Sequence, residues 1–228
     1  MGLSVPSGSM SVMDERTHEL RQAHDRLAEV YAERLAGHLA QVPADRAVLG
    51  LFGELVRGAS DSTAGEMLVG DIGCGTGRLA PFLTTLGLSP RGLDLSPEMV
   101  RVARREHPGF TFEVGDLRAL PFEDASLSGA VCWYSLIFLP PEERAAAFAE
   151  LARVVRPGGY LAAAYKVGDG STHRGGISLG VAFDVYWLDP AQMQRFAEEA
   201  GFEVVFRAER PAEPDEYQPQ GYLVARRR

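Results

Sequence analysis

The sequence has 228 residues, of which 46% are hydrophobic, and a formal net charge of -8 at pH 7. This length and apolar content suffice for one well-buried α/β domain, and no apolar run is long enough to cross a membrane. The acidic balance argues against a nucleic-acid partner, because binding a phosphate backbone usually requires a basic face. No signal peptide is visible, and Cys74 and Cys132 have neither zinc-site nor disulfide spacing, which favours a cytoplasmic protein.

Two helices are predicted at the start of the chain. Residues 1–12 are expected to be a disordered lead, and an amphipathic helix is predicted over Asp14–Leu39, where leucines recur near the helical period. Pro43 breaks this pattern, and a second helix is predicted over Ala44–Arg57. Residues 13–58 would form an N-terminal helical cap.

The strongest local signal is a glycine-rich turn after a buried strand. The strand is predicted at Met67–Ile72 and is followed by Gly73, Gly75 and Gly77. Such a turn lets backbone N–H groups approach a ligand closely, and a helix that begins near Gly77 would favour an anionic group at its N-terminus. The dinucleotide-binding fingerprint expects its third glycine where this chain has Arg78, so the turn alone does not separate a cofactor loop from a plain turn.

An acidic residue follows each of the next two predicted strands. Asp94 lies at the end of Pro90–Leu95, about 20 residues past the turn, where a carboxylate can accept hydrogen bonds from both hydroxyls of a ribose. A solvated loop acid is the alternative, which the glycine turn makes less favoured. Asp116 follows the strand Phe110–Val114, where its carboxylate can meet an adenine amino group while Leu117 covers a ring face.

The rest of the chain alternates between strands and helices. The predicted segments are a strand at Ser128–Tyr134 that ends in Trp133-Tyr134-Ser135, a helix at Pro141–Val155, a strand at Tyr160–Tyr165, a helix from Asp189 to Ala200, and strands at Phe202–Glu209 and Gly221–Arg226. Residues 166–180 hold five glycines and are predicted to be a long mobile loop. The aromatic stretch Phe183–Leu188 is interpreted as a short strand or a lid wall, and residues 166–188 together would form a lid that orders over a substrate.

Five motifs, in this order, resemble those of the class I S-adenosylmethionine-dependent methyltransferases: VGDIGCGTG, LDLSPEM, VGDLRALPF, the Trp133-Tyr134-Ser135 strand end and LARVVRPGGYL. The resemblance covers about Glu66–Arg228, and is closest to small stand-alone bacterial enzymes that act on small molecules. It implies an α/β fold with a Rossmann-like, doubly wound, seven-stranded sheet whose last strand is antiparallel, and a methyltransferase domain at residues 66–228. Ligands should bind at the carboxyl ends of the strands.

The resemblance also implies the cofactor S-adenosyl-L-methionine and the residues that hold it. These residues are Tyr31, Asp71, Gly73, Cys74, Gly75, Gly77, Asp94, Leu95, Met99, Gly115, Asp116, Leu117, Trp133, Tyr134 and Ser135. A tyrosine such as Tyr31, on the N-terminal cap, often reaches the methionine end of the cofactor in this family.

The expected reaction is metal-independent methyl transfer to an oxygen or nitrogen of a small molecule, mainly by proximity and orientation. A metal-dependent catechol-type enzyme would place an aspartate at the fourth strand end, and none is present. Tyr134 is one candidate catalytic residue. His173 is the other, because of the five histidines only His173 follows the fifth strand on the ligand side; a solvated loop histidine is its alternative.

Other classes fit the motifs less well. A nicotinamide-dependent oxidoreductase is disfavoured by Arg78 and by Asp116 with its neighbours, and a cytosine methyltransferase by Val131 before Cys132. An adenine-amino methyltransferase would carry Asn/Asp-Pro-Pro-aromatic at the fourth strand end. A cofactor-binding protein that serves as a non-catalytic partner or regulator stays possible.

The acceptor is expected to be a small molecule bound by a monomer or homodimer, with no nucleic acid or membrane involved. Candidate residues for the acceptor side are Tyr134, Tyr165, His173, Asp184, Tyr186, Trp187, Glu216 and Tyr217, each of which has core packing or a solvated surface as its alternative.

Overall fold

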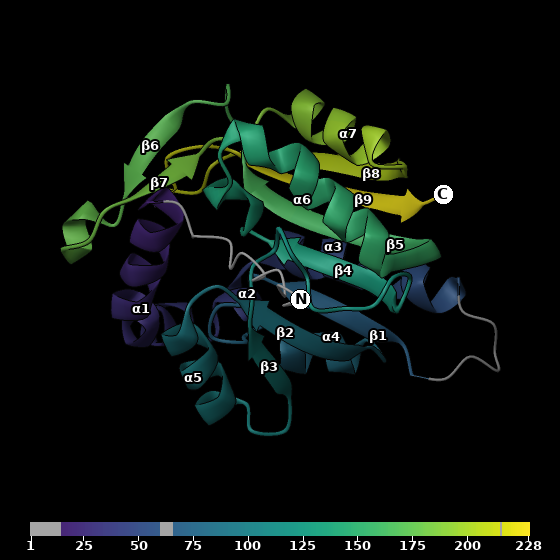
Figure 1. The fold of residues 1–228 in the computed structure, drawn as a ribbon, viewed down its shortest axis with the longest axis horizontal. Coiled ribbons are helices and arrows are strands. Elements are labelled where there is room, and N and C mark those ends of the chain that lie inside the picture. Colours follow the sequence, from purple (N-terminus) through teal and green to yellow (C-terminus); the bar gives the residue numbers. More distant parts are fainter. Residues whose placement is uncertain (1–14, 60–65, 215) are drawn as a thin grey trace, which may run out of the picture.

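A seven-stranded sheet with the order β3-β2-β1-β4-β5-β9-β8 organises the chain (Figure 1). The computed structural model describes residues 15–59, 66–214 and 216–228, so the predicted lead lies outside the described residues. The strands are β1 (Leu68–Ile72), β2 (Ser89–Asp94), β3 (Thr111–Val114), β4 (Leu127–Trp133), β5 (Val155–Lys166), β8 (Phe202–Arg210) and β9 (Gln220–Arg227). The last strand, β9, runs antiparallel to β5 and β8 on either side of it, and the other strand pairs are parallel, which confirms the predicted sheet.

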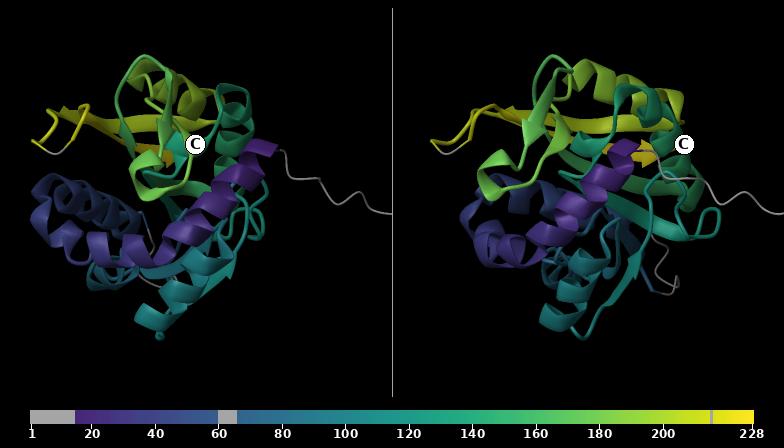
Figure 2. Two further views of the ribbon diagram at one scale, coloured as in Figure 1. Left: turned by 90° about the vertical axis from the view of Figure 1, so that its left-hand side faces the viewer. Right: turned by 60° about the vertical axis from the view of Figure 1, so that its left-hand side comes forward.

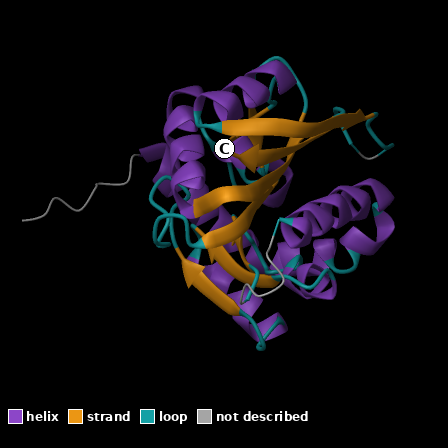
Figure 3. Cartoon of the chain, turned by 90° about the vertical axis from the view of Figure 1, so that its right-hand side faces the viewer, coloured by secondary structure: helices purple, strands orange, loops and turns teal. Residues whose placement is uncertain are grey.

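Helices cover both faces of this sheet (Figure 3). On one face lie α3 (Pro43–Gly58) and α4 (Ala80–Thr85), and on the other α6 (Pro141–Val154) and α7 (Pro190–Glu199). Every residue of β4 is buried, as expected for a strand at the centre of a two-faced parallel sheet. The helix α5 (Pro97–Glu106) packs on β2 and β3. None of the helices in the described ranges is long and apolar enough to cross a membrane.

The N-terminal cap differs from the single long helix that was predicted. The first helix, α1, spans Glu15–Leu35, and the separate short helix α2 spans His38–Gln41. Between them, Gly37 has φ 69°, a left-handed conformation that ends a right-handed helix. The cap is therefore bent, and α1 packs against α5.

The predicted mobile loop after β5 is wrong, because this segment forms an antiparallel hairpin. Its strands are β6 (Thr172–Gly175) and β7 (Phe183–Tyr186), with a 3-10 turn at Ile177–Leu179. Gly176 and Gly180 flank that turn with φ 77° and 75°, which supplies the left-handed backbone the reversal requires.

The hairpin and α1 lie side by side over the carboxyl ends of the parallel strands (Figure 2). Arg174 joins them, because its guanidinium pairs with Glu19 of α1 at 2.6 Å and with Asp184 of β7 at 2.7 Å. The hairpin and α1 together cover the edge of the sheet where ligands bind in open α/β folds.

Candidate active site

A cavity of about 560 Å³ opens at the carboxyl ends of β1, β2, β3 and β4, beneath α1 and the hairpin. Of the predicted cofactor-binding residues, fourteen line it: Tyr31, Asp71, Gly73, Cys74, Gly75, Asp94, Leu95, Met99, Gly115, Asp116, Leu117, Trp133, Tyr134 and Ser135. The structure therefore brings together residues spread over more than a hundred positions of the chain.

The three glycines of the turn after β1 have different roles. A Cβ on Gly73 (φ 77°) would lie 2.3 Å from the Cβ of Ser135, so Gly73 permits close packing of two strand ends. Gly75 (φ 55°) borders the cavity, and a Cβ there would meet no atom within 4 Å. Only Gly75 thus leaves open space for a ligand against its backbone.

Gly77 is the one predicted cofactor residue that does not line the cavity. A Cβ at this position would lie 2.6 Å from Cζ of Phe112, so the absence of a side chain serves packing of the turn against β3. Because Gly77 is left-handed (φ 78°), α4 begins only at Ala80 rather than near Gly77 as predicted.

Asp94 ties the end of β2 to the glycine turn. Its Oδ2 accepts the Gly75 N–H at 2.8 Å and its Oδ1 accepts the Ser96 N–H at 2.9 Å. Partial burial raises the pKa of Asp94, while these N–H donors and His24 on α1 oppose that rise. Tyr31 is close enough that the Asp94 charge adds to the burial that raises the tyrosine pKa.

Several polar side chains that line the cavity have buried atoms with no hydrogen-bond partner in the protein, and Asp71 and Arg78 are the charged pair of them beside the glycine turn. Both carboxylate oxygens of Asp71 are buried and unpaired, and so is Nη1 of Arg78. Burial raises the pKa of Asp71 to about 7, although the charge of Arg78 opposes this. In the sequence, Arg78 drew attention only because it stands where the dinucleotide-binding fingerprint has a glycine. The structure places its side chain in the site. Buried polar atoms normally have hydrogen-bond partners, so we expect a ligand or water to supply the partners of these atoms.

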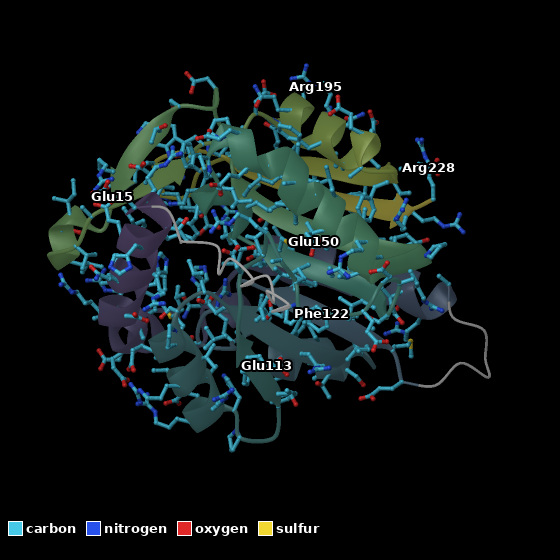
Figure 4. The ribbon with its side chains drawn as sticks, in the orientation of Figure 1. Glu15, Glu113, Phe122, Glu150, Arg195 and Arg228 are labelled. Carbon is cyan, nitrogen blue, oxygen red and sulfur yellow. The ribbon has the colours of Figure 1, made fainter. Side chains whose placement is uncertain are left out.

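Asp116 is engaged by a neighbour in this structure. Both of its carboxylate oxygens accept from the guanidinium of Arg118, with the shortest contact at 2.6 Å, and Arg118 also pairs with Glu143 at 2.8 Å. The loop is held further along where the Leu120 N–H donates to Glu150 on α6 at 3.0 Å; Figure 4 labels Glu150. The Asp116 carboxylate is thus held in place by protein groups at the cavity edge.

The end of β4 rests on a buried hydrogen-bond network. Asp45 of α3 accepts from Trp133 Nε1 and from the Tyr222 hydroxyl, both at 2.8 Å. The next residue, Tyr134, has φ 62°, a costly conformation for a non-glycine residue that turns the chain at the cavity. Burial raises the pKa of Tyr134 far above its ordinary value, so its hydroxyl stays protonated at neutral pH.

The structure does not bring His173 to the cavity. Its ring stacks on Trp187 with 3.6 Å between centroids, and Nε2 lies 2.9 Å from the Ser171 hydroxyl. Two histidines that were set aside, His24 and His38, line the cavity instead. Of the other acceptor-side candidates, Tyr134, Asp184, Tyr186, Glu216 and Tyr217 line it, whereas Tyr165 and Trp187 do not.

The cysteines are both free and buried, and burial raises the pKa of the Cys132 thiol to about 12, so neither behaves as an activated nucleophile. Among the described residues, no group of three or more His, Cys, Asp or Glu side chains is arranged to hold a metal ion.

Comparison with known proteins supports the resemblance to methyltransferases that the sequence motifs indicate. A family model described as a methyltransferase domain matches residues 69–159. A malonyl-acyl-carrier-protein O-methyltransferase of Serratia marcescens is 38% identical over 109 residues, which are 48% of this chain and 42% of that protein. The chain thus spans less than half the length of this curated relative.

Solved structures share the whole fold at low sequence identity. Magnesium protoporphyrin IX methyltransferase from Synechocystis PCC 6803, solved with bound S-adenosylmethionine, superposes with a TM-score of 0.68 at 21% identity, over 96% of this chain and 100% of that one. A (4+2) cyclase superposes with a TM-score of 0.67 at 18% identity, over 95% and 97%. The matched domain at residues 69–159, the motif order and the sheet topology all agree with the resemblance to the class I S-adenosylmethionine-dependent methyltransferases.

Proposed function

We propose that the protein binds S-adenosylmethionine and catalyses methyl transfer to an oxygen or nitrogen of a small molecule. The bound cofactor would supply an electrophilic methyl group on a sulfonium. The protein would supply binding, alignment of the acceptor with that methyl group and exclusion of water. A strong protein nucleophile is not required for this chemistry.

The observation that carries the proposal is the presence of Asp71 and Arg78, two buried groups of opposite charge with unpaired atoms, in one cavity. The methionine end of the cofactor is an amino acid zwitterion, with one ammonium and one carboxylate. The unpaired oxygens of Asp71 suit the ammonium, and the unpaired Nη1 of Arg78 suits the carboxylate. A nicotinamide dinucleotide offers phosphates and no ammonium group to this part of the cavity.

The nucleoside end would lie along the ends of β2 and β3. Asp94 is fixed by two backbone donors and retains lone pairs for ribose hydroxyls, and Gly75 leaves the space beside it open. Leu95, Met99 and Leu117 provide apolar surface for a purine ring. This arrangement fits an adenosine next to the zwitterion site.

The proposed acceptor side of the cavity is lined by apolar and aromatic side chains. Leu20 and His24 of α1, Phe138 after β4, and Phe183 and Tyr186 of the hairpin lie around it. Such a lining suits a small, partly aromatic acceptor. The relative from Serratia marcescens is named as an O-methyltransferase, which agrees with transfer to oxygen. The end of β4 bears Trp133, Tyr134 and Ser135, so the proposed reaction is metal-independent.

A second candidate is a protein that binds the cofactor without transferring its methyl group. The match to a cyclase favours keeping it, because the fold alone does not determine the chemistry. The two candidates differ in turnover and share cofactor binding.

Titration calorimetry with S-adenosylmethionine, S-adenosylhomocysteine and NAD, each with and without EDTA, tests the proposal. We expect binding of the first two, unaffected by EDTA, and none of NAD. Formation of S-adenosylhomocysteine with a panel of small hydroxyl and amine compounds then separates the enzyme from the non-catalytic binder. Binding of NAD in preference to both sulfur nucleosides would contradict the proposal.

A further inference from the structure

His24 is the histidine that α1 presents to the acceptor side of the cavity. It lies on the same face of the helix as Leu20 and Tyr31, and all three line the cavity. Its side chain is half-buried, so the ring is partly shielded from solvent but open to a ligand.

A backbone contact fixes the protonation pattern of this ring. Nδ1 of His24 lies 2.9 Å from the carbonyl oxygen of Leu20, one turn earlier in α1. A carbonyl oxygen only accepts hydrogen bonds, so Nδ1 must carry the proton in the neutral ring. Nε2 is then the unprotonated nitrogen, with a lone pair available to accept a proton.

Aromatic side chains from three elements surround the ring. Phe138, just after β4, and Phe183 of β7 each lie 4.9 Å from it, and Tyr31 of α1 lies 5.9 Å away, all between centroids. The two phenylalanines also contact each other at 5.7 Å. A flat, apolar molecule would fit this setting, and a polar group on it would find His24 among apolar neighbours.

The charge facing His24 from the sheet is that of Asp94. The interaction with His24 lowers the pKa of Asp94, so the two side chains lie close enough to interact. Of the groups that pack on the ring, Tyr31 is ionisable and protonated at neutral pH, because burial raises its pKa, and Phe138 and Phe183 carry no charge. A proton transferred to Nε2 would lie near this carboxylate.

We propose that the acceptor is a planar compound with a phenol-type hydroxyl and that His24 Nε2 is its general base. This inference rests on the proposed methyl-transfer function. In the step, the acceptor O–H bond breaks and its proton goes to Nε2. The freed oxygen pair forms the new O–CH₃ bond, and the S–CH₃ bonding pair stays on sulfur, which becomes a neutral thioether. The imidazolium then releases its proton to solvent.

The other candidate groups fit this role less well. His173 stacks on Trp187 outside the cavity. Tyr134 stays protonated at neutral pH because burial raises its pKa, so it can donate a hydrogen bond but not accept a proton. His38 lies on α2, whereas the rings of Tyr31, Phe138 and Phe183 pack around His24.

A binding measurement without turnover tests the proton transfer. The probe is 7-hydroxycoumarin, a planar phenol whose neutral and ionised forms absorb at different wavelengths, added to protein saturated with S-adenosylhomocysteine. We expect bound probe to be ionised at a lower pH than free probe. The His24→Asn variant keeps an N–H in the place of Nδ1 but has no group at Nε2, and it should bind the probe in its neutral form. His18→Ala is the matched control, since His18 is exposed on the same helix and pairs with Gln22.

Turnover gives the second readout. With a phenol that the parent methylates, His24→Asn should lower kcat by roughly 10²–10⁴-fold while the Kd for S-adenosylmethionine stays within about twofold. The loss should shrink with 4-nitrophenol at a pH where that probe is already ionised, because no base is then needed. Rescue of this kind distinguishes a base from a residue that only shapes the cavity.

Three results would overturn the inference. The first is a protein that binds S-adenosylmethionine but neither binds nor methylates any phenol, which leaves the methyl-transfer proposal standing for another acceptor. The second is a phenol that the parent and His24→Asn methylate equally. The third is an equal loss of activity in the variant with ionised and neutral phenols, which assigns His24 a structural role. Failure to bind S-adenosylmethionine at all would instead contradict the proposed function itself.

Discussion

The Asp71 carboxylate and Nη1 of Arg78 are buried at the same cavity, and neither has a hydrogen-bond partner within the protein. Each shifts the pKa of the other toward its charged form, although burial dominates for both. Buried charged groups normally have hydrogen-bond partners. We interpret these two unpartnered groups of opposite charge as a site for a ligand that carries both charges.

Substitution of either residue should weaken binding only of ligands that contain the amino acid group. For Asp71→Asn and Arg78→Gln we expect the Kd for S-adenosylhomocysteine to rise by about 10–100-fold, because each loses one charge-assisted hydrogen bond worth about 1.5–3 kcal/mol. The control ligand is 5′-methylthioadenosine, which lacks the zwitterion and should bind both variants like the parent. An equal loss for the two ligands would show that the pair supports the cavity rather than the ligand.

The free protein should become more stable when Asp71 is neutralised. Its pKa rises from 3.8 to about 7 in the folded state, so the folded protein binds more protons in that window and this group makes folding less favourable as the pH rises through it. Asp71→Asn should therefore increase the free energy of unfolding above pH 7 by at most about 4 kcal/mol, with no gain below pH 4. Denaturant unfolding at both pH values measures this difference. A variant less stable than the parent at neutral pH would contradict it.

Asp94→Ala should weaken binding of every adenosine ligand. The carboxylate would lose two charge-assisted hydrogen bonds to ribose hydroxyls, with water recovering part, which we estimate as about 2–4 kcal/mol. Because Asp94 also accepts the Gly75 N–H, the turn itself should loosen. S-adenosylhomocysteine and 5′-methylthioadenosine should be affected alike, unlike in the Asp71 variant. Unchanged calorimetric affinity in a folded Asp94 variant would place the ribose elsewhere.

Two glycines of the same turn should give opposite phenotypes. Gly75→Val puts a side chain into the space left for the ligand, so we expect loss of cofactor binding, with some strain because φ is 55°. Gly77→Ala creates a 2.6 Å contact with Phe112 and should lower the melting temperature. Thermal melts with and without S-adenosylmethionine measure both effects. A Gly75 variant that is still stabilised by the cofactor would contradict the assignment.

The hairpin should act as a cover that closes over the acceptor. We expect proteolysis near residues 168–176 in the free protein and slower cleavage with cofactor and acceptor bound. Arg174→Met removes the pairing of the hairpin with Glu19 on α1 and should speed cleavage in the free protein. Since the ion pair is exposed, the effect on global stability should be below about 1 kcal/mol. Equal cleavage in the free and bound states would count against a cover.

The central sheet was predictable because its signals are local. An apolar run, a glycine turn and an acid after the next strand indicate one Rossmann-like edge, and fourteen of fifteen predicted cofactor residues line the cavity. Gly77 is the exception, since its role depends on Phe112, whose place next to the turn follows from strand pairing rather than from local sequence. The strand β6 was missed for the same reason, because Thr172–Gly175 is polar and has no strand pattern until it pairs with β7.

The histidines show most clearly how far the sequence can predict where a side chain lies. His24 lies at helical spacing from Leu20, Leu27 and Tyr31, so the sequence did contain a signal that it shares their buried face. His173 follows the fifth strand on the ligand side, yet the alternation of β6 directs its ring onto Trp187. Position along the chain indicates which end of a sheet a residue occupies, but tertiary pairing decides where its side chain points.

Calorimetric titration of the purified protein with S-adenosylhomocysteine and with 5′-methylthioadenosine, compared between the parent and Arg78→Gln, tests the central claim most directly. We predict that the parent binds both ligands, with S-adenosylhomocysteine the tighter, and that the variant binds the two about equally. No binding of either ligand by the parent, or the same preference in the parent and the variant, would contradict the assignment of this cavity to S-adenosylmethionine.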